Sequence, residues 1–497
     1  MTDATVERTY GGWRRPASPG LWTLGTVGTA VMFGGMIVTI AVLMFAGLIV
    51  AIPFAFATVL TTAPMAWHTE DGRNVVQLLT ARTAWGRGRL AGANLYRSGP
   101  LARHGYGTCA LPGLAASIEA LDARDARGRE FGLLSNRSVG HASIVLVALP
   151  DSSSLVDADL VDQQVAHWAG WLANLAYEPD LVAAQVLIEA APDSGIRLRR
   201  EVQGQLVRTA PPLARQVLGE VVDGYPAGSA AISSYLSLTW STAARPGQKR
   251  RTVDEMALEV AQRLPGLTVG LAATGAGPVR PLTVAEIAAS VRVAFDPAVH
   301  AVVDELGGAK AGIEWSECGP VGAEEHRGDY LHDSGTSVTW SMAAPPRGVV
   351  FSSVLARLLA PHPDIARKRV SITFRPHKPA TAARVVENDR KTAIFRSQSR
   401  KVGRAADEVE VIAAKQAADD EARGAGVVRF GLLVTATVLN PAELPAAVAA
   451  VESLAGSSRL RLRRMWGSQA VAFQANLPLG MSLPSHVKVP GVIREAL

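Results

Sequence analysis

The sequence predicts an α+β protein in which an N-terminal two-helix transmembrane hairpin precedes a large cytoplasmic region. Three observations support this class. The 497 residues are 48% hydrophobic and 19% charged, which excludes a wholly disordered chain. No charged residue occurs between Leu21 and Trp67. Beyond His104, short β-branched runs alternate with segments of helical periodicity, which is typical of a mixed fold.

The uncharged stretch at 21–67 is predicted to cross the membrane twice. A single helix of this length would measure about 70 Å, against a hydrocarbon core of about 30 Å. We therefore expect helices near 22–44 and 48–67, joined by a short turn at Gly47. A cleaved signal peptide is the alternative, but the apolar stretch is too long for one and follows a mostly polar segment.

Arginines on both sides of the hairpin predict its orientation. Residues 1–20 form a basic N-terminus and residues 68–104 a basic juxtamembrane linker. Because both flanks are basic, the positive-inside rule predicts a multi-pass protein of the plasma membrane with both termini in the cytoplasm. Membrane lipid is then a partner, and residues 74–90 form either a helix against anionic lipid or a solvated linker. Two cysteines without a disulfide pattern suit a cytoplasmic location.

The remaining sequence predicts two ferredoxin-like α+β modules, at 105–306 and 336–497, with a connecting loop region at 307–335. In the first module, strands are expected at 142–149, 182–190, 232–240 and 267–272, with helices at 157–177 and 197–223, from 253, and after 283. In the second, strands are expected at 337–342, 369–374, 427–439 and 459–462, with helices at 352–359, 380–422 (broken at Gly403) and 441–454. The tail after these elements is predicted to be irregular.

The sequence predicts no enzyme: no catalytic residue, no cofactor-binding residue and no metal site. No window matches the glycine-rich pattern whose amides and lysine hold nucleotide phosphates, and the common hydrolase and metalloprotease motifs do not occur. The one alternative is a membrane-tethered cysteine or zinc hydrolase built on Cys318, His326 and His332. A structural loop is favoured there, because working triads are usually assembled from distant segments.

Basic residues form two clusters near strand ends, at Arg367–Arg369 and at Arg461, Arg463 and Arg464. No aromatic residues alternate with these charges, as a stacking surface for single-stranded nucleic acid would require. We therefore predict no direct sequence-specific binding of nucleic acid. A solvated face or a surface that docks a protein partner is the expected role.

Several longer strings indicate a family. They are YGGWRR at 10–15, GPVGAEE at 319–325, HDSGTSVTW at 332–340, KRV at 368–370 with RP at 375–376, and LRRMWGSQ at 462–469. With these strings the chain resembles, up to about Gly480, an actinobacterial family of uncharacterised integral membrane proteins that are typically encoded beside conjugation-type ATPases. The hairpin also resembles the small PrgI-like membrane proteins of Gram-positive conjugative type IV secretion.

The segment at 466–480 resembles the one that closes the N-terminal domain of the conjugative transfer ATPases, in which a P-loop domain follows. The resemblance implies a non-catalytic, membrane-anchored scaffold of a conjugation-like secretion or DNA-transfer apparatus. Its implied partners are a separate P-loop ATPase, other membrane subunits of the apparatus and further copies of the chain. A type VII secretion component resembling EccE is the alternative family, because it shares the architecture but not the strings.

The segment before Gly480 contains the residues expected to dock the ATPase. An interface that was once intramolecular is expected to keep arginine and aromatic anchors. The candidate docking residues are Arg461, Arg463, Arg464, Trp466 and Phe473. The alternative that Trp466 and Phe473 only seal the local core stays open at this point.

Overall fold

A computed structural model gives the fold of the chain. It describes residues 8–13, 24–67, 69, 73–102, 107–150, 156–193, 195–207, 209–224, 230–245, 247–346, 348–398 and 405–487. Arg14, Arg15 and Gly403, which carried part of the sequence interpretation, lie outside these residues. The described residues form a mixed α+β protein with two apolar N-terminal helices and a large antiparallel sheet, as the coarse fold class predicted.

The apolar stretch forms two antiparallel helices, α1 (Gly25–Ala46) and α2 (Leu48–Ala66), joined at Gly47 as predicted. Both helices are long and apolar enough to span a membrane, with mean hydropathies of 2.2 and 1.9. The two helices approach closely at Gly35, where a Cβ atom would lie 2.5 Å from the Thr58 side chain. Small residues at such crossings permit the close packing of membrane helices.

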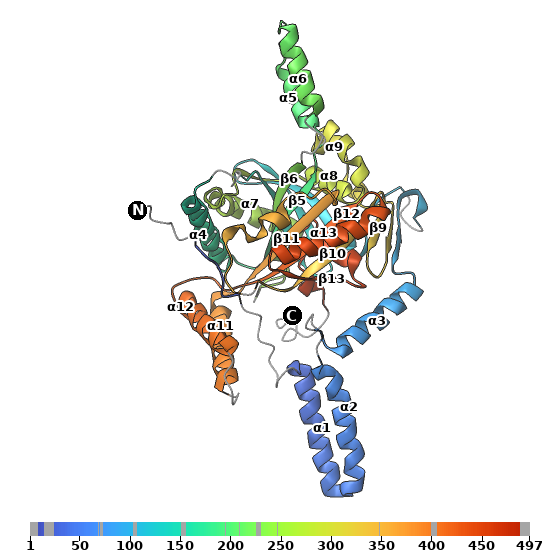
Figure 1. Cartoon of the computed structure of the whole chain (residues 1–497), viewed down its shortest axis with the longest axis vertical. Helices are drawn as coiled ribbons and strands as arrows, with labels where there is room; N and C mark the ends of the chain where they lie inside the picture. The colour runs from blue at the N-terminus through green and yellow to red at the C-terminus, as the bar shows by residue number, and fades with distance from the viewer. Residues whose placement is uncertain are drawn as a thin grey trace.

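The rest of the chain is organised around a thirteen-stranded sheet (Figure 1). Along the sheet the order is β1-β8-β9-β10-β12-β11-β5-β6-β4-β3-β2, while β13 pairs with β10 and β7 with β4. The strands are β1 (Leu95–Arg97), β2 (Ile118–Arg124), β3 (Glu130–Asn136), β4 (His141–Ala148), β5 (Leu181–Pro192), β6 (Ala230–Ser241), β7 (Val279–Pro281), β8 (Gly322–Glu325), β9 (Tyr330–His332), β10 (Gly335–Ala344), β11 (Arg367–Pro376), β12 (Val428–Val438) and β13 (Arg461–Arg464).

The sheet contains two halves with the same strand order. In the first half the order is β7-β4-β6-β5, and in the second it is β13-β10-β12-β11. The four strands of each half can be numbered in chain order. In both halves the first strand then lies between the fourth and the third, and the second strand is at the end. These two end strands, β5 and β11, pair with each other in antiparallel register, so that the halves share one continuous sheet.

Helices connect the strands in the same positions in both halves. The helices after the hairpin are α3 (Val75–Leu90), α4 (Ala158–Leu175), α5 (Ile196–Gln205), α6 (Pro212–Gly224), α7 (Val253–Val269), α8 (Val284–Phe295), α9 (His300–Leu306), α10 (Ala356–Leu359), α11 (Pro379–Gln398), α12 (Ala405–Ala422), α13 (Leu444–Ser457) and α14 (Gln469–Ala475). A pair of helices, α5–α6 or α11–α12, separates the second and third strands of each half and projects from the body (Figure 1). Capping boxes at Thr252 and Thr283 begin α7 and α8.

Alternate strand residues face two different cores. Leu133 and Ile144 pack with α4 and α7, whereas their neighbours Leu134 and Val145 pack with α8 and the C-terminal segment. In the second half, Val434 packs with α10 and α13. Val370 of β11 lies opposite Ile188 of β5, and this pairing aligns the faces of the two halves. Helices α10 and α13 therefore lie on the same face of the sheet as α4 and α7. The other face is covered by α8 and the segment that follows β13.

Most predicted elements coincide with observed ones, with three differences. The helix expected at 197–223 is two helices, α5 and α6, because the chain leaves the helical conformation after Gln205 and α6 begins only at Pro212. The strand expected at 267–272 is wrong, because α7 continues to Val269 and the fourth strand is the later β7. The tail expected to be irregular contains α14 and a buried segment beyond it.

Both flanks of the hairpin are attached to the sheet body. Before α1, the backbone of Tyr10 pairs with Val350 at 2.8 Å in each direction, and the Tyr10 hydroxyl donates to Asp162 of α4 at 2.5 Å. After α2, helix α3 leads to β1, which pairs with β8. Figure 1 shows α1 and α2 extending together from one side of the body, with α5 and α6 at the opposite end. The chain therefore enters and leaves the hairpin on one side.

Candidate functional site

The basic residues of β13 lie at an edge of the sheet. Within the described residues β13 pairs with β10 alone, which leaves its other side without a strand neighbour. Arg461 is exposed, Arg463 donates from Nη2 to the Ser341 hydroxyl at 3.3 Å, and Arg464 donates from Nε to the Gly328 carbonyl at 2.8 Å. Charged side chains on such an edge also discourage unwanted strand pairing, which is a purely structural reason for their presence.

Trp466 completes this edge as a half-exposed ring held by two guanidinium groups. Its exposed fraction is 49%, which leaves a large aromatic surface open to a partner. The Arg464 Cζ atom is 4.6 Å from the ring centroid and the Arg327 Cζ atom 5.8 Å. Cation–π contacts of this kind orient the ring without covering it. We call Arg327, Arg461, Arg463, Arg464 and Trp466 the β13 patch.

Phe473 does not belong to this patch. Its side chain is completely buried, with ring centroids 4.6 Å from His332, 5.2 Å from Phe295 and 5.3 Å from Tyr330. The Arg369 Cζ atom lies 4.9 Å from the same ring. Phe473 therefore seals the core, which was the alternative interpretation. The geometry leaves Trp466 and the three arginines as the accessible members of the candidate docking set.

The segment that contains Phe473 crosses the sheet from one half to the other. We call residues 469–482 the C-terminal strap. Gln469 hydrogen-bonds the backbone of Thr339 in β10, and Asn476 donates to the Arg369 carbonyl of β11. The Ala475 carbonyl accepts from Gln185 of β5. Further on, the Gly480 carbonyl accepts from Thr239 of β6 at 2.7 Å.

Gly480 is required by this crossing. Its φ of +63° is a left-handed conformation, and a Cβ atom there would lie 2.6 Å from the Thr239 hydroxyl and 2.7 Å from Ser143. Truncation of the chain after Leu454 would remove β13 and the whole strap together with the candidate docking residues. Surface substitutions are therefore the appropriate test of docking.

No two of the residues Cys318, His326 and His332 form a catalytic pair. Cys318 is buried and donates to the Trp315 carbonyl, and burial raises the pKa of its thiol to about 12. The two ring nitrogens of His332 contact the Phe295 carbonyl and the Ser337 hydroxyl, and burial lowers its pKa to about 3. His326 is paired instead with Asp329 and Glu324. Among the described residues no group of three or more metal-ligating side chains comes together.

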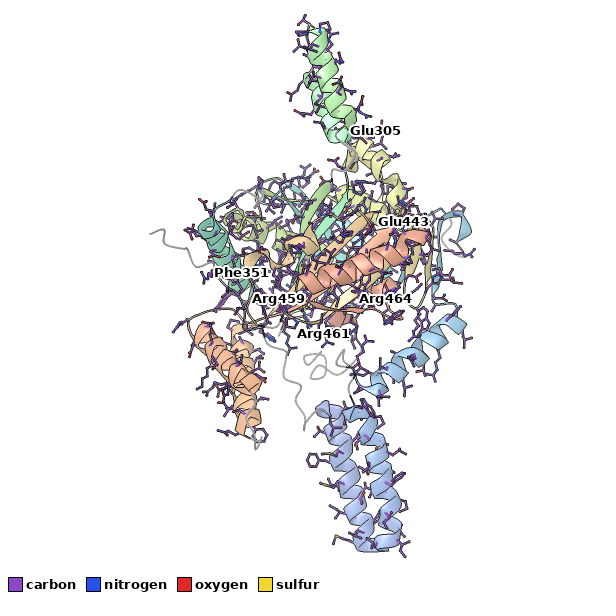
Figure 2. All side chains as sticks on the ribbon, viewed as in Figure 1. Glu305, Phe351, Glu443, Arg459, Arg461 and Arg464 are labelled. Atoms are coloured by element: carbon purple, nitrogen blue, oxygen red, sulfur yellow. The ribbon has the colours of Figure 1, made fainter. Side chains whose placement is uncertain are left out.

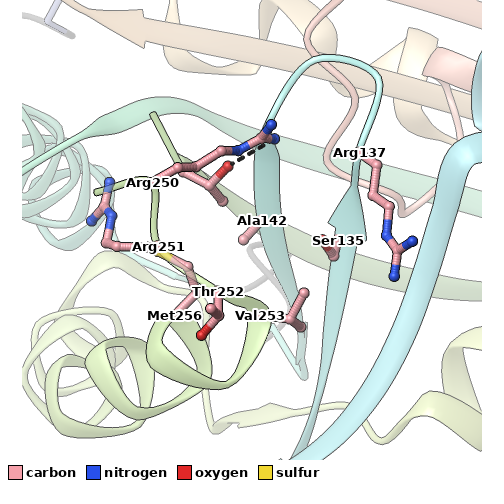
Figure 3. A pocket seen from close by; sticks show the side chains of 9 residues that line it. Ser135, Arg137, Ala142, Arg250, Arg251, Thr252, Val253 and Met256 are labelled. Atoms are coloured by element: carbon pink, nitrogen blue, oxygen red, sulfur yellow. Dashed lines mark hydrogen bonds between the residues drawn. The ribbon is translucent and has the colours of Figure 1, made fainter. Parts of the chain in front are cut away.

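A pocket of about 220 Å³ lies between the first turn of α7 and strands β3 and β4 (Figure 3). Arg250 crosses its mouth and donates to the Thr242 hydroxyl at 3.4 Å, while Arg137 lies on the other side and pairs with Glu119. Arg251 is paired with Asp180 and Glu259. Because these cations already have protein partners, the pocket is not assigned a ligand.

A buried ionic group at the seam between the halves was not anticipated from the sequence. Glu189 of β5 pairs with Arg367, and its Oε2 atom lies 4.0 Å from Nε of Arg369, the residue opposite it on β11. Burial by itself raises the pKa of Glu189, but the two arginines outweigh this effect and hold that pKa below its usual value. The cluster predicted as a solvated or docking face is therefore interior at Arg367 and Arg369.

Comparison with known proteins adds one finding. A family described as a domain of unknown function, DUF8461, matches residues 17–77, which include both apolar helices. The match ends at the start of α3 and leaves the sheet region unmatched. A search of curated proteins found no match to the chain.

Proposed function

We propose that this protein is a non-catalytic membrane scaffold of a conjugation-like secretion or DNA-transfer apparatus, which docks a separate P-loop ATPase. The observation that carries the proposal is the attachment of both hairpin flanks to one body, through the Tyr10–Val350 pairing before α1 and the β1–β8 pairing after α3. A body held in this way remains at one membrane face. The resemblance of the chain to proteins encoded beside transfer ATPases supports the choice of apparatus.

In this proposal α1 and α2 cross the plasma membrane and both termini are cytoplasmic. Three arginines on the body support this orientation. Figure 2 shows Arg459, Arg461 and Arg464 on the side of the body toward α1 and α2, whereas Glu305 and Glu443 lie away from it. Basic residues next to the membrane are typical of its cytoplasmic face.

Each half of the sheet is proposed to be a ferredoxin-like module. The repeated order, in which the first strand lies between the fourth and the third, supports this assignment, as do the helices that follow the first and third strands. The helical pairs α5–α6 and α11–α12 are then insertions at the same hairpin of the two modules.

The β13 patch is proposed as the docking surface for the ATPase. Exposed tryptophan and arginine side chains are enriched among the residues that dominate binding energy at interfaces. Trp466 offers an oriented ring and Arg461 an exposed charge, both on a rigid strand end. Homo-oligomerisation and contacts with other membrane subunits belong to the same proposal.

Loss of the Trp466 ring is expected to weaken the ATPase complex at least tenfold, because truncation of an interface anchor commonly removes more than about 1.4 kcal/mol. The full chain is co-purified from detergent-solubilised membranes with the P-loop ATPase encoded beside its gene. Trp466→Ala and Arg461→Glu should both reduce recovery of the ATPase. The matched controls are Tyr177→Ala and Arg124→Glu, exposed residues far from β13, and they should not reduce it.

Equal recovery of the ATPase by all four variants would overturn docking at the β13 patch. If Arg461→Glu instead makes the chain aggregate while ATPase recovery per folded chain is unchanged, the arginines serve only to protect the strand edge. Thermal unfolding of each variant establishes the folded fraction.

A further inference from the structure

Helix α3 has a surface that none of the described residues covers. All of its residues are described and none is buried. Leu79 is 53% exposed and Leu90 is 91% exposed. The two residues are eleven positions apart, which at 3.6 residues per turn brings them to within about 20° of each other on the helix. The exposed leucines therefore share one face, which we call the outer face of α3.

Arginines border this outer face. At about 100° per residue, Arg82 lies about 60° to one side of Leu79 and Arg87 about 80° to the other. Both side chains are exposed. The helix contains three arginines and no acidic residue, so its charges are not neutralised within the element. Arginines that follow a membrane-spanning hairpin directly are attracted to anionic lipid headgroups.

The other side of α3 faces the body. The Trp85 ring lies against Gly467, where a Cβ atom would be 3.6 Å from that ring. Trp85 is about 120° from Leu79 around the helix, so this contact leaves the outer face free. The body therefore fixes the rotation of α3 about its axis, and with it the direction of Leu79 and Arg82.

The hairpin fixes the level of α3 relative to the bilayer. Trp67, which ends α2, is 75% exposed, and tryptophan is enriched at membrane–water interfaces. Helix α3 begins at Val75, contacts α2 and runs obliquely from the end of the hairpin to the body (Figure 1). Its first turns, which include Leu79 and Arg82, are thus closest to the lipid headgroups.

We propose that the outer face of α3 binds the anionic headgroups of the cytoplasmic leaflet, with Leu79 inserted among them and Arg82 and Arg87 on the phosphates. This inference rests on the proposed membrane location of α1 and α2. It adds a lipid class that the protein recognises, because arginines at the headgroup level are attracted to acidic lipids. The contact would hold the body, and with it the β13 patch, at a fixed height above the bilayer.

The test places a fluorescent probe on each side of α3 in the full chain. The background is Cys109→Ser, since the remaining Cys318 is buried, and the probe is attached at Leu79→Cys or at Ala84→Cys. Ala84 is the matched control, because it is exposed on the same helix but about 140° away from Leu79. Each protein is reconstituted in nanodiscs of phosphatidylcholine alone or mixed with phosphatidylglycerol.

In nanodiscs that contain phosphatidylglycerol, a headgroup spin label should quench the probe at position 79 at least twofold more than the probe at position 84. Iodide in solution should show the opposite preference. The double substitution Arg82→Glu and Arg87→Glu should remove the dependence on phosphatidylglycerol, whereas Arg199→Glu on the distant α5 should not. Because α3 contains no buried residue, these changes leave the core intact.

Two results would overturn the inference. Equal quenching of the two probes by the spin label in a chain that has entered the nanodisc would show that α3 does not contact lipid. Protection of position 79 from iodide only after the ATPase is added would identify the outer face as a protein interface. A chain that does not enter nanodiscs at all would instead contradict the membrane hairpin, so the two failures are distinguishable.

Discussion

Replacing Phe473 by alanine is expected to destabilise the protein by about 3–5 kcal/mol, the usual cost of removing a large buried aromatic side chain. The Phe473 ring is completely buried. Besides two other aromatic rings, it contacts the His332 imidazole and the Arg369 guanidinium. Its loss leaves a cavity under the C-terminal strap and exposes a buried cation to it. Urea unfolding of the full chain in detergent, followed by near-ultraviolet circular dichroism, measures the effect.

The matched control is Phe395→Ala, which removes the same ring from α11, where it is 70% exposed. This substitution should change the free energy of unfolding by less than about 0.5 kcal/mol. A loss below about 1 kcal/mol for Phe473→Ala would contradict the assignment of the strap to the core. It would also revive the interpretation of Phe473 as a docking residue.

Substitution of Glu189 by glutamine is expected to cost about 3–5 kcal/mol, because it leaves two buried arginines without their counter-charge. The Glu189 side chain is 6% exposed and is shared between Arg367 and Arg369. These residues lie on β5 and β11, the strands that join the two halves. The variant should therefore lower the midpoint of unfolding and weaken the seam specifically.

A double variant separates the charge effect from packing. Glu189→Leu combined with Arg367→Met should be less destabilised than Glu189→Gln. The double variant leaves only Arg369 without a counter-charge, whereas Glu189→Gln leaves both arginines without one. Glu443→Gln, an exposed carboxylate, is the surface control. If Glu189→Gln unfolds at the same urea concentration as this control, the ionic group does not hold the seam.

The elements that could be predicted from the sequence are those with a strong local signal. The charge-free run predicted α1, α2 and the turn at Gly47, because length and apolarity are enough to identify helices that could span a membrane. The long β-branched runs gave β5, β6 and β12 to within a few residues. Short strands such as β1, β8 and β9 have no such signal, because the pairing partners define them.

The missed features depend on contacts between distant segments. The strand expected at 267–272 has β-forming residues, but the capping box at Thr252 and the burial of Leu264 and Thr268 keep this stretch in α7. The strap has no periodicity of its own. In β10 and β12, Ser or Thr alternates with apolar residues, and this pattern is the one signal that could have indicated a covering segment. It was not informative by itself, because the same alternation is found in strands with one solvated face. In the structure those hydroxyls are buried.

The candidate site was predictable only in part. Arg461, Arg463, Arg464 and Trp466 lie together at the edge, as their proximity in sequence suggested. Phe473 and Arg369 could not be assigned to the interior from the sequence, because their burial requires the register of β11 with β5 and the path of the strap across it. Arginine beside valine in a strand is usually exposed, and only a carboxylate on the partner strand makes the interior position tolerable.

Cysteine accessibility in intact cells distinguishes a body anchored by the hairpin at the cytoplasmic face of the membrane from one on the outer face. In a Cys109→Ser background, Phe45→Cys lies at the turn of the hairpin, where the side chain is 92% exposed, and Tyr177→Cys lies on the body. A membrane-impermeant maleimide applied to intact cells should label position 45 and should label position 177 only after permeabilisation. Labelling of position 177 in intact cells would place the body outside the cytoplasm and rule out the proposed orientation.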